Sequence, residues 1–151
     1  MKPDTIDNFI EECKNRGLNV TFPRMAIYKI LLQFQGHPSA EDIYKEIKKE
    51  HPYISLATVY KTLEMLAENN LITKVTPLHD IVRYDFNKEF HHHLVCIRCK
   101  KIIDIESEVL NHLPIPKNID KNFKILNYQV QFDGICKDCQ QNYAKSKEQR
   151  A

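Results

Sequence analysis

The stretch "SLATVYKTLEMLAENNLI", residues 55–72, decides the fold, because it predicts a helix followed directly by a β-hairpin. Its apolar side chains recur at helical spacing and share one face: Leu56, Val59, Leu63 and Leu66. Two short apolar runs follow, "LITKV" (71–75) and "IVRYDF" (81–86), and the turn-rich link "TPLHD" (76–80) indicates a hairpin. A helix that runs into such a hairpin is typical of winged-helix proteins, in which that helix reads DNA.

The sequence upstream of this stretch predicts three more helices. The first ends near Gly17 and carries the apolar stripe Ile6, Phe9, Ile10 and Cys13, so Cys13 is expected to fill the core. The second begins around Pro23 and continues the period with Ile27, Ile30, Leu31 and Phe34. Ser39 can cap the third, whose apolar face is Ala40, Ile43, Tyr44 and Ile47. Residues 1–86 are therefore predicted to form a winged-helix DNA-binding domain.

The segment "NKEF" (87–90) is the predicted hinge, because the pattern changes beyond it from helices to strands. Strands are predicted at "HHLVCI" (92–97), "KKIIDIE" (100–106) and "FKILNYQVQF" (123–132). Pro114 and Pro116 interrupt any long helix between the last two strands. The polar tail "NYAKSKEQRA" (142–151) is expected to fray. Residues 87–151 are predicted to form a small α/β domain, so the expected fold class is α+β.

Composition narrows the class of protein. The 151 residues are 42% hydrophobic and 28% charged, which suits a globular chain with a packed core. The formal net charge is only +2, and residues 1–85 carry 11 Lys and Arg against 12 Asp and Glu. A DNA-binding first half must therefore use a few well-placed cations. The opening "MKPDTIDN" lacks the apolar core of a signal peptide and no run is long enough to span a bilayer, so we expect a cytoplasmic protein without a membrane partner.

Four of the five cysteines form two C-x-x-C pairs, Cys96 with Cys99 and Cys136 with Cys139. A two-residue gap lets both thiolates of a turn face one ion, and two such turns complete the closed tetrahedron of structural zinc. A single pair could also be a redox dithiol, but two pairs in one short cytosolic chain favour Zn²⁺. Because the second pair follows the last strand, the ion would hold the C-terminal domain together, and folding should be coupled to metal binding.

Three consecutive histidines precede the first cysteine pair. Side chains alternate between the faces of a strand, so His91 and His93 share one face and His92 takes the other. Cys96 is an odd number of steps from His93, which also separates the thiols from these two imidazoles in a regular strand. Two histidines on one face are common as ordinary surface residues, so more donors are needed to indicate a second metal site.

Three further donors are available in the sequence. Asp104 ends the neighbouring strand, Asp85 ends the presumed wing, and His37 lies between the second and third predicted helices. Each has an ordinary interpretation when taken alone: a turn residue, a solvated strand end or a loop histidine. Spacing does not join His37 to the others.

The sequence nevertheless resembles the Fur family of metal-dependent bacterial repressors over nearly its whole length. The resemblance is carried by "FPRMAIYKIL", "GHPSAEDIY", "SLATVYKTLEML", "VRYDF", "HHHLVCIRCKKIIDIE" and "GICKDC". The combination of "ATVYKTL" with H-x-H-x-x-C-x-x-C is highly specific. It implies a homodimer, joined through a C-terminal α/β dimerisation domain, that binds a pseudo-palindromic operator in double-stranded DNA.

The resemblance also implies two sets of ligands. Structural Zn²⁺ would be held by Cys96, Cys99, Cys136 and Cys139. A regulatory Fe²⁺ or Mn²⁺ would be held by His37, Asp85, His91, His93 and Asp104. The two aspartates are similar to the peroxide-sensing branch of the family, whereas iron-uptake regulators carry glutamates there. A further metal site of iron-type members is expected to be missing, because Tyr128 stands where they have a histidine. His92 and Glu106 are nearby donors that could supplement the regulatory site, but we expect both to be surface residues.

The donor set predicts a mechanism. Three imidazoles and two carboxylates suit Fe²⁺ or Mn²⁺ and leave one position open on an octahedral ion. We expect H₂O₂ to be reduced there by Fe²⁺ and the oxidant to attack an adjacent imidazole, which the family resemblance implies to be His37 or His91, so that the metal leaves and repression ends. One ion held by both domains would also fix the separation of the two reading heads and raise DNA affinity by linkage. Such a sensor consumes its own ligand and is not an enzyme.

Five residues are candidate DNA contacts. Thr58, Tyr60 and Lys61 lie on the predicted reading helix and could contact bases or phosphates. Arg24 and Lys74 could contact the DNA backbone. The family resemblance favours Tyr60 and Lys61, and each of the others could equally be an ordinary solvated side chain.

Other functions compete with this interpretation. The nearest is a regulator of the same family that responds to iron or manganese availability without peroxide chemistry. A metal-dependent hydrolase or oxygenase is a different class, but no nucleophile motif or Gly-rich phosphate loop supports it. A zinc-stabilised interaction module without DNA binding is a third possibility.

Overall fold

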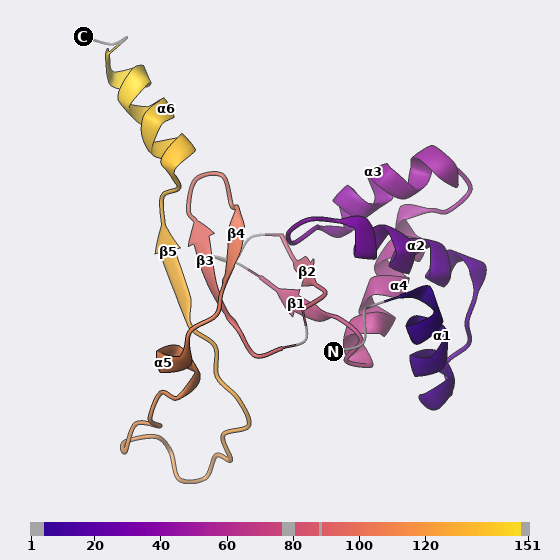
Figure 1. Cartoon of the computed structure of the whole chain (residues 1–151), viewed down its shortest axis with the longest axis horizontal. Helices are drawn as coiled ribbons and strands as arrows, with labels where there is room; N and C mark the ends of the chain where they lie inside the picture. The colour runs from indigo at the N-terminus through magenta and orange to yellow at the C-terminus, as the bar shows by residue number, and fades with distance from the viewer. Residues whose placement is uncertain (1–4, 77–80, 88, 149–151) are drawn as a thin grey trace. The chain divides into compact units, whose positions relative to one another are not determined.

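The computed structural model describes residues 5–76, 81–87 and 89–148 (Figure 1). The chain folds as two compact units, Met1–Lys88 and Glu89–Ala151. Within the described residues, the first unit contains four helices and a two-stranded sheet, and the second contains a three-stranded sheet and two helices. The predicted fold class, α+β, is confirmed.

The four helices of the first unit are α1 (Ile6–Asn15), α2 (Phe22–Gln33), α3 (Ala40–Glu50) and α4 (Leu56–Glu68). Each follows a hydroxyl residue that accepts a hydrogen bond from a first-turn N–H: Thr5, Thr21, Ser39 and Ser55. Gly17, just after α1, has a φ of 66°, a left-handed conformation that glycine adopts without strain. The helix boundaries therefore follow from local capping chemistry.

A hairpin closes the first unit. Strand β1 (Thr73–Val75) pairs antiparallel with β2 (Arg83–Asp85), and the register places Thr73 opposite Asp85. Most of the predicted hairpin link, residues 77–80, lies outside the described residues. The order of helices and hairpin confirms the winged-helix prediction for this unit.

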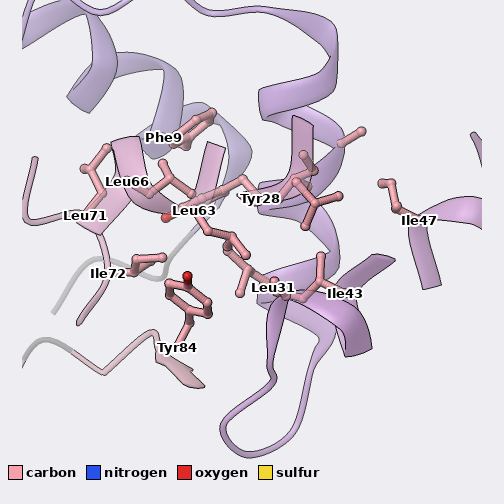
Figure 2. Close-up of a cluster of buried hydrophobic side chains, with 14 of the residues drawn as sticks. Phe9, Tyr28, Leu31, Ile43, Ile47, Leu63, Leu66, Leu71, Ile72 and Tyr84 are labelled. Carbon is pink, nitrogen blue, oxygen red and sulfur yellow. The ribbon is translucent and has the colours of Figure 1, made fainter. Parts of the chain in front are cut away.

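One apolar core holds the first unit together (Figure 2). Phe9 of α1 stacks on Tyr28 of α2, with ring centroids 4.1 Å apart. Leu63 and Leu66 of α4 are fully buried, as the helical period predicted, and so is Cys13. Burying a side chain of this size stabilises the fold by roughly 1.5–3 kcal/mol. Because these residues fix one face of α4 against the core, the opposite face is left for other contacts.

The second unit is built on a mixed sheet with the strand order β4-β3-β5. Its strands are β3 (His92–Cys96), β4 (Ile102–Ile105) and β5 (Gln131–Gly134), and its helices are α5 (Glu108–Asn111) and α6 (Lys137–Glu148). Strand β3 pairs antiparallel with β4 and parallel with β5. Figure 1 shows α5 and α6 at opposite ends of this sheet. One end of β3 therefore lies near α5, which follows β4, and the other end lies near α6, which follows β5.

The prediction of a strand over residues 123–132 is largely wrong. Strand β5 begins only at Gln131, where β3 offers a backbone partner to each residue from Gln131 to Gly134. The preceding alternation of apolar residues belongs to exposed backbone: Phe123 is 72% and Leu126 is 83% exposed. A period of two indicates a strand only where a neighbouring strand is available to pair with it.

The expectation of a frayed polar tail is also wrong for residues 142–148. These residues belong to α6, which continues to Glu148. The ring of Tyr143 lies 4.4 Å from the guanidinium carbon of Arg98 and 5.0 Å from Nζ of Lys147. These cation–π contacts help to order a helix that has little apolar surface of its own. No helix in the described part of the chain is long and apolar enough to cross a bilayer.

Candidate metal centres and nucleic-acid interface

The structure brings the four paired cysteines together in the second unit. Strand β3 ends at the first, the turn to β4 carries the second, and the other two lie between β5 and the first turn of α6. All four sulfur atoms lie within 4.8 Å of one another: Cys96, Cys99, Cys136 and Cys139. The Sγ atoms of Cys99 and Cys136 are 3.7 Å apart, and the backbone N–H of Cys136 donates to Sγ of Cys96 at 3.4 Å. This arrangement is a four-sulfur cluster closed by two turns.

The electrostatics of the cluster favour a bound cation. Hydrogen bonds from the backbone N–H groups of Cys136 and Cys99 lower the pKa of the Cys96 thiol to about 6. At Cys139, hydrogen bonding to the sulfur of Cys136, together with burial and the other thiols, raises the pKa to about 12. Four adjacent thiolates repel one another, and a divalent ion removes that repulsion. The donor set and its closure fit a structural Zn²⁺.

A second group of donors lies at the other end of the strand pair β3–β4. His93 pairs with Asp104 across the sheet, and the ligand atoms of His91, His93 and Asp104 lie within 4.8 Å of one another. The two Nε2 atoms are 3.1 Å apart, and each is 3.5 Å from Oδ1 of Asp104. The Nδ1 atom of His91 donates to the backbone oxygen of Glu89 at 2.6 Å, which leaves a lone pair on Nε2.

A third group lies within the first unit, where the structure brings His37 and Asp85 together. Nε2 of His37 is 3.2 Å from Oδ2 of Asp85, and both side chains are nearly buried. The loop that carries His37 is attached to strand β2: the backbone N–H of Tyr84 donates to the oxygen of Pro38, and Arg83 donates to the oxygen of His37. Two residues 48 positions apart are thus placed as a pair by backbone and side-chain hydrogen bonds of their own unit.

Each unit therefore presents its own imidazole–carboxylate group. Nitrogen and oxygen donors of this kind suit divalent ions such as Fe²⁺ and Mn²⁺, and neither group contains a thiolate. The pairing of His37 with Asp85 could not be predicted from spacing, because it depends on the contact between the α2–α3 loop and the wing.

His92 is a site residue whose position the sequence analysis got wrong. It is completely buried and not at the surface. Its Nδ1 accepts a hydrogen bond from the backbone N–H of Val130, so its Nε2 carries the proton and donates to Oδ1 of Asn111, each at 3.1 Å. The rings of Phe90 and Tyr128 lie beside it. Strand alternation does not reveal this burial, because Leu94, on the same face of the strand as His92, is 37% exposed.

His92 therefore fixes the position of the segment that carries the candidate ligands His91 and His93. It links β3 to α5 through Asn111 and to the segment before β5 through Val130. The hydroxyl of Tyr128 adds hydrogen bonds to the backbone of Leu110 and Leu113. Glu106 is exposed, as predicted.

The candidate DNA contacts on α4 lie on the side away from the core. Tyr60 is 39% exposed, and its hydroxyl donates to Oε1 of Glu41 in α3. Lys61 is exposed, and no ion pair is recorded for it among the described residues. Thr58 is half-buried, and its hydroxyl lies 3.0 Å from that of Ser55, the residue that caps the helix.

The two remaining candidates have partners within the first unit. Arg24, in the first turn of α2, donates to the backbone oxygen of Asn19 at 2.6 Å. Lys74, on β1, forms an ion pair with Oε2 of Glu64 on α4. Neither contact is buried, so a phosphate could compete for both cations.

The winged-helix unit, the four-sulfur cluster and the two imidazole–carboxylate groups together define a metal-responsive DNA-binding regulator. The profile of the ferric uptake regulator family matches residues 15–133. The chain belongs to this family and is a metal-responsive transcriptional regulator.

The relatives include both iron and peroxide regulators. The ferric uptake regulation protein of Bacillus subtilis (strain 168) is 37% identical over 139 residues, which cover 89% of this chain and 93% of the relative. The peroxide-responsive repressor PerR of Staphylococcus aureus (strain Mu50 / ATCC 700699) is 29% identical over 135 residues, 89% of this chain and 91% of the relative.

Solved structures show the same fold. The ferric uptake regulator of Helicobacter pylori matches with a TM-score of 0.73 at 24% identity, over 93% of this chain and 97% of that one. PerR from Streptococcus pyogenes matches with a TM-score of 0.52 at 29% identity, over 90% of this chain and 93% of that one.

Proposed function

We propose that the protein is a homodimeric repressor that binds a pseudo-palindromic operator in double-stranded DNA when loaded with metal, and releases it when H₂O₂ oxidises a histidine of its regulatory site. The observation that carries the proposal is the chemistry of the regulatory donors. They are three imidazoles and two aspartates without sulfur: His37, Asp85, His91, His93 and Asp104. The similarity to PerR over 89% of the chain supports the same assignment.

In this proposal one Fe²⁺ or Mn²⁺ takes ligands from both units. His37 and Asp85 arrive as a pair because β2 holds the His37 loop, and His91 offers Nε2 because Glu89 holds Nδ1. The ion then joins a winged-helix domain (1–86) to an α/β dimerisation domain (87–151), and its binding free energy favours the conformation that fits the operator.

Peroxide sensing follows from the same donors. Fe²⁺ held there would supply the redox chemistry that splits the O–O bond of H₂O₂. In the net reaction one oxygen atom of H₂O₂ would be added to the ring of His37 or His91, which is oxidised by two electrons, and the other oxygen would leave as water. The oxidised ring would be a poor ligand, so the link between the units would be lost and DNA affinity would fall. The four cysteines hold a structural Zn²⁺ and take no part in sensing: Cys96, Cys99, Cys136 and Cys139.

The homodimer is supported by the apolar surface of the second unit. Val109, Phe123 and Leu126 are each more than 70% exposed, and Phe132 is 47% exposed on β5. Monomeric proteins rarely leave so many large apolar side chains in contact with water, and a second copy would cover them. Two reading heads related by a twofold axis predict a pseudo-palindromic operator.

DNA contacts are proposed for the exposed side of α4 and its surroundings. Tyr60 and Lys61 would contact base edges, with Thr58 beside them, and Arg24 and Lys74 would contact phosphates. The exposure of Tyr60 and Lys61 supports this assignment.

A second candidate function is regulation by iron or manganese availability without peroxide chemistry. It is favoured by the 37% identity to the ferric uptake regulation protein of Bacillus subtilis, which exceeds the 29% identity to PerR. Both candidates use the same ligands, and they differ in what peroxide does to the Fe²⁺ form.

The deciding experiment measures DNA binding by the Fe²⁺- and Mn²⁺-loaded protein, each with and without peroxide. The probe is a duplex selected from a random library by the Mn²⁺-loaded protein. We expect peroxide to abolish binding of the Fe²⁺ form alone and to add one oxygen, about 16 Da, to a peptide containing His37 or His91. Retention of binding by the oxidant-treated Fe²⁺ form would favour the availability sensor, and oxygen found only on cysteine or methionine would contradict histidine oxidation.

A further inference from the structure

We infer that Glu64 is a specificity-determining residue of the nucleic-acid interface. Glu64 binds Lys74 in the DNA-free protein and competes with DNA phosphates for this lysine. Glu41, which accepts a hydrogen bond from Tyr60, adds a second negative charge that repels phosphates from this surface. The inference rests on the proposed DNA contacts of α4 and the wing. It adds that two carboxylates on this surface restrain binding to DNA of any sequence.

Glu64 is held in place from the core side. Its Oε1 accepts a hydrogen bond at 3.2 Å from the hydroxyl of Tyr84, a residue of β2 that is only 1% exposed. Its Oε2 accepts a hydrogen bond from Nζ of Lys74. The hydrogen bond from Lys74 lowers the pKa of Glu64, so the carboxylate stays charged at neutral pH. Tyr84 therefore aims a fixed negative charge at a cation of the wing.

The Glu64–Lys74 pair is weak enough to be exchanged. The side chains of Glu64 and Lys74 are 43% and 41% exposed, and ion pairs at such exposure contribute little to stability. A DNA phosphate can thus bind Lys74, but the phosphate must displace the carboxylate of Glu64 and then lie close to this like charge. Lys74 consequently contributes less to phosphate binding than a solvated lysine would.

A second carboxylate lies on the same side of the first unit. Oε1 of Glu41 accepts the hydrogen bond of the Tyr60 hydroxyl, and this bond is the main reason that the pKa of Tyr60 is raised. Oε2 of Glu41 is buried, and among the described residues it has no hydrogen-bond partner. Tyr60, which contacts Glu41, lies one helical turn before Glu64 on α4, so the two acids lie on neighbouring positions of the same surface.

The consequence for DNA recognition follows from charge. Binding to DNA of arbitrary sequence depends almost entirely on phosphate contacts, which release counterions. Residues 1–85 carry one more acidic than basic residue, so this half has no excess of cations to spare. A carboxylate that occupies Lys74 lowers the affinity for every sequence, and stable occupancy then requires the base contacts that only an operator provides.

The test uses the full-length Mn²⁺-loaded protein and its Glu64→Gln variant. The amide of the variant keeps an oxygen that can accept the Tyr84 hydroxyl, so the fold and the zinc content should be unchanged. We expect roughly threefold tighter binding to a random-sequence duplex at about 0.1 M salt, within the energy range of an exposed ion pair. The plot of log K against log salt concentration should steepen by up to about 0.9, the value for one more neutralised phosphate.

Matched variants separate the effect from a general change in charge. Glu46→Gln on α3 removes the same charge and frees Lys49, which Glu46 holds at 2.8 Å, and it should change neither affinity nor slope appreciably. Glu41→Gln should tighten binding to the random duplex. If Glu64→Gln binds like the wild type, or if Glu46→Gln has the same effect as Glu64→Gln, the inference is overturned. If the wild type binds no duplex under any metal condition, the DNA-binding function itself fails.

Discussion

The two units of this molecule are stabilised by different means. The first unit closes a continuous apolar core to which all four helices and the wing contribute, with Leu63 and Tyr84 almost completely buried (Figure 2). In the described part of the second unit, the buried apolar residues are few: Val95, Cys96 and Ile102. Buried histidines and a four-sulfur cluster take the place of a core there. The first unit can be stable through burial alone, whereas the proposed function makes the second unit dependent on metal and on a second copy of the chain.

The largest expected effect is the loss of the sulfur cluster. Cys96→Ser should abolish stoichiometric zinc binding and unfold the second unit, because zinc binding contributes on the order of 10 kcal/mol to small metal-dependent domains. Hydrogen exchange should show loss of protection at the β3 amides, His92–Cys96, while the α4 amides stay protected. Cys13→Ser, which changes the cysteine outside the cluster, should retain zinc. Protected β3 amides in the Cys96→Ser variant would show that the second unit does not depend on the ion.

The converse change is made in the first unit. Leu63→Ala should destabilise that unit by about 2–5 kcal/mol, because a fully buried leucine is replaced by a cavity. Chemical denaturation followed by hydrogen exchange of α4 measures the effect, and zinc content should remain that of the wild type. If the Leu63→Ala variant lost its zinc when α4 unfolded, the two units would not be stabilised independently.

The third effect concerns His92. His92→Gln cannot satisfy both Val130 and Asn111 with the same geometry, and an unsatisfied buried polar group costs about 1–3 kcal/mol. Because His91 and His93 flank it, we expect Mn²⁺ affinity to fall roughly 10-fold with zinc content unchanged. Titration with Mn²⁺ measures this, and His112→Gln, at an exposed histidine, is the control. Equal Mn²⁺ affinities for the two variants would remove His92 as a positioning residue.

The smallest effect is at the start of α3, one turn after the His37 loop. Burial by itself raises the pKa of the Asp42 carboxyl, but hydrogen bonds from Ser39 and the charge of Arg83 outweigh it, so the pKa lies below its ordinary value of 3.8. The contribution of Asp42 to stability is therefore present above about pH 3.8 and is lost as the pH falls through the lower folded value. Asp42→Asn should lower the free energy of unfolding at pH 7 by about 1 kcal/mol or less.

Thermal unfolding between pH 2 and 7 tests this. The difference between wild type and Asp42→Asn should shrink at the acidic end, because the wild-type residue then also loses its charge. Glu46→Gln, on the same helix, should show no comparable pH dependence. A difference that stays constant down to pH 2 would exclude the cap carboxylate as its source.

The same contrast explains what could be predicted from the sequence. In the first unit the helical period and the caps at Ser39 and Ser55 define the elements, because each residue's neighbours along the chain decide its state. In the second unit, apolar alternation at 123–132 predicted a strand that forms only from Gln131, because strands require partners that are distant in sequence.

The candidate metal ligands divide along similar lines. The two C-x-x-C spacings predicted one site of four cysteines, and the structure brings their sulfur atoms within 4.8 Å of one another. His37 and Asp85 could be joined only through family resemblance, because their contact depends on hydrogen bonds from Arg83 and Tyr84 to the loop. The burial of His92 was missed because its partners, Asn111 and Val130, lie far along the chain.

The attachment of the α2–α3 loop to β2 limits how this chain can vary. An insertion between Phe34 and Pro38 would displace the imidazole of His37, because two hydrogen bonds now position its loop against strand β2. Such an insertion should lower metal affinity more than it lowers stability. The stretch 112–130 carries none of the nine proposed ligands, so additions there can enlarge or reshape the surface proposed to contact a second copy of the chain. Homologues should therefore keep the α2–α3 loop at constant length, whereas the length of the segment 112–130 should vary.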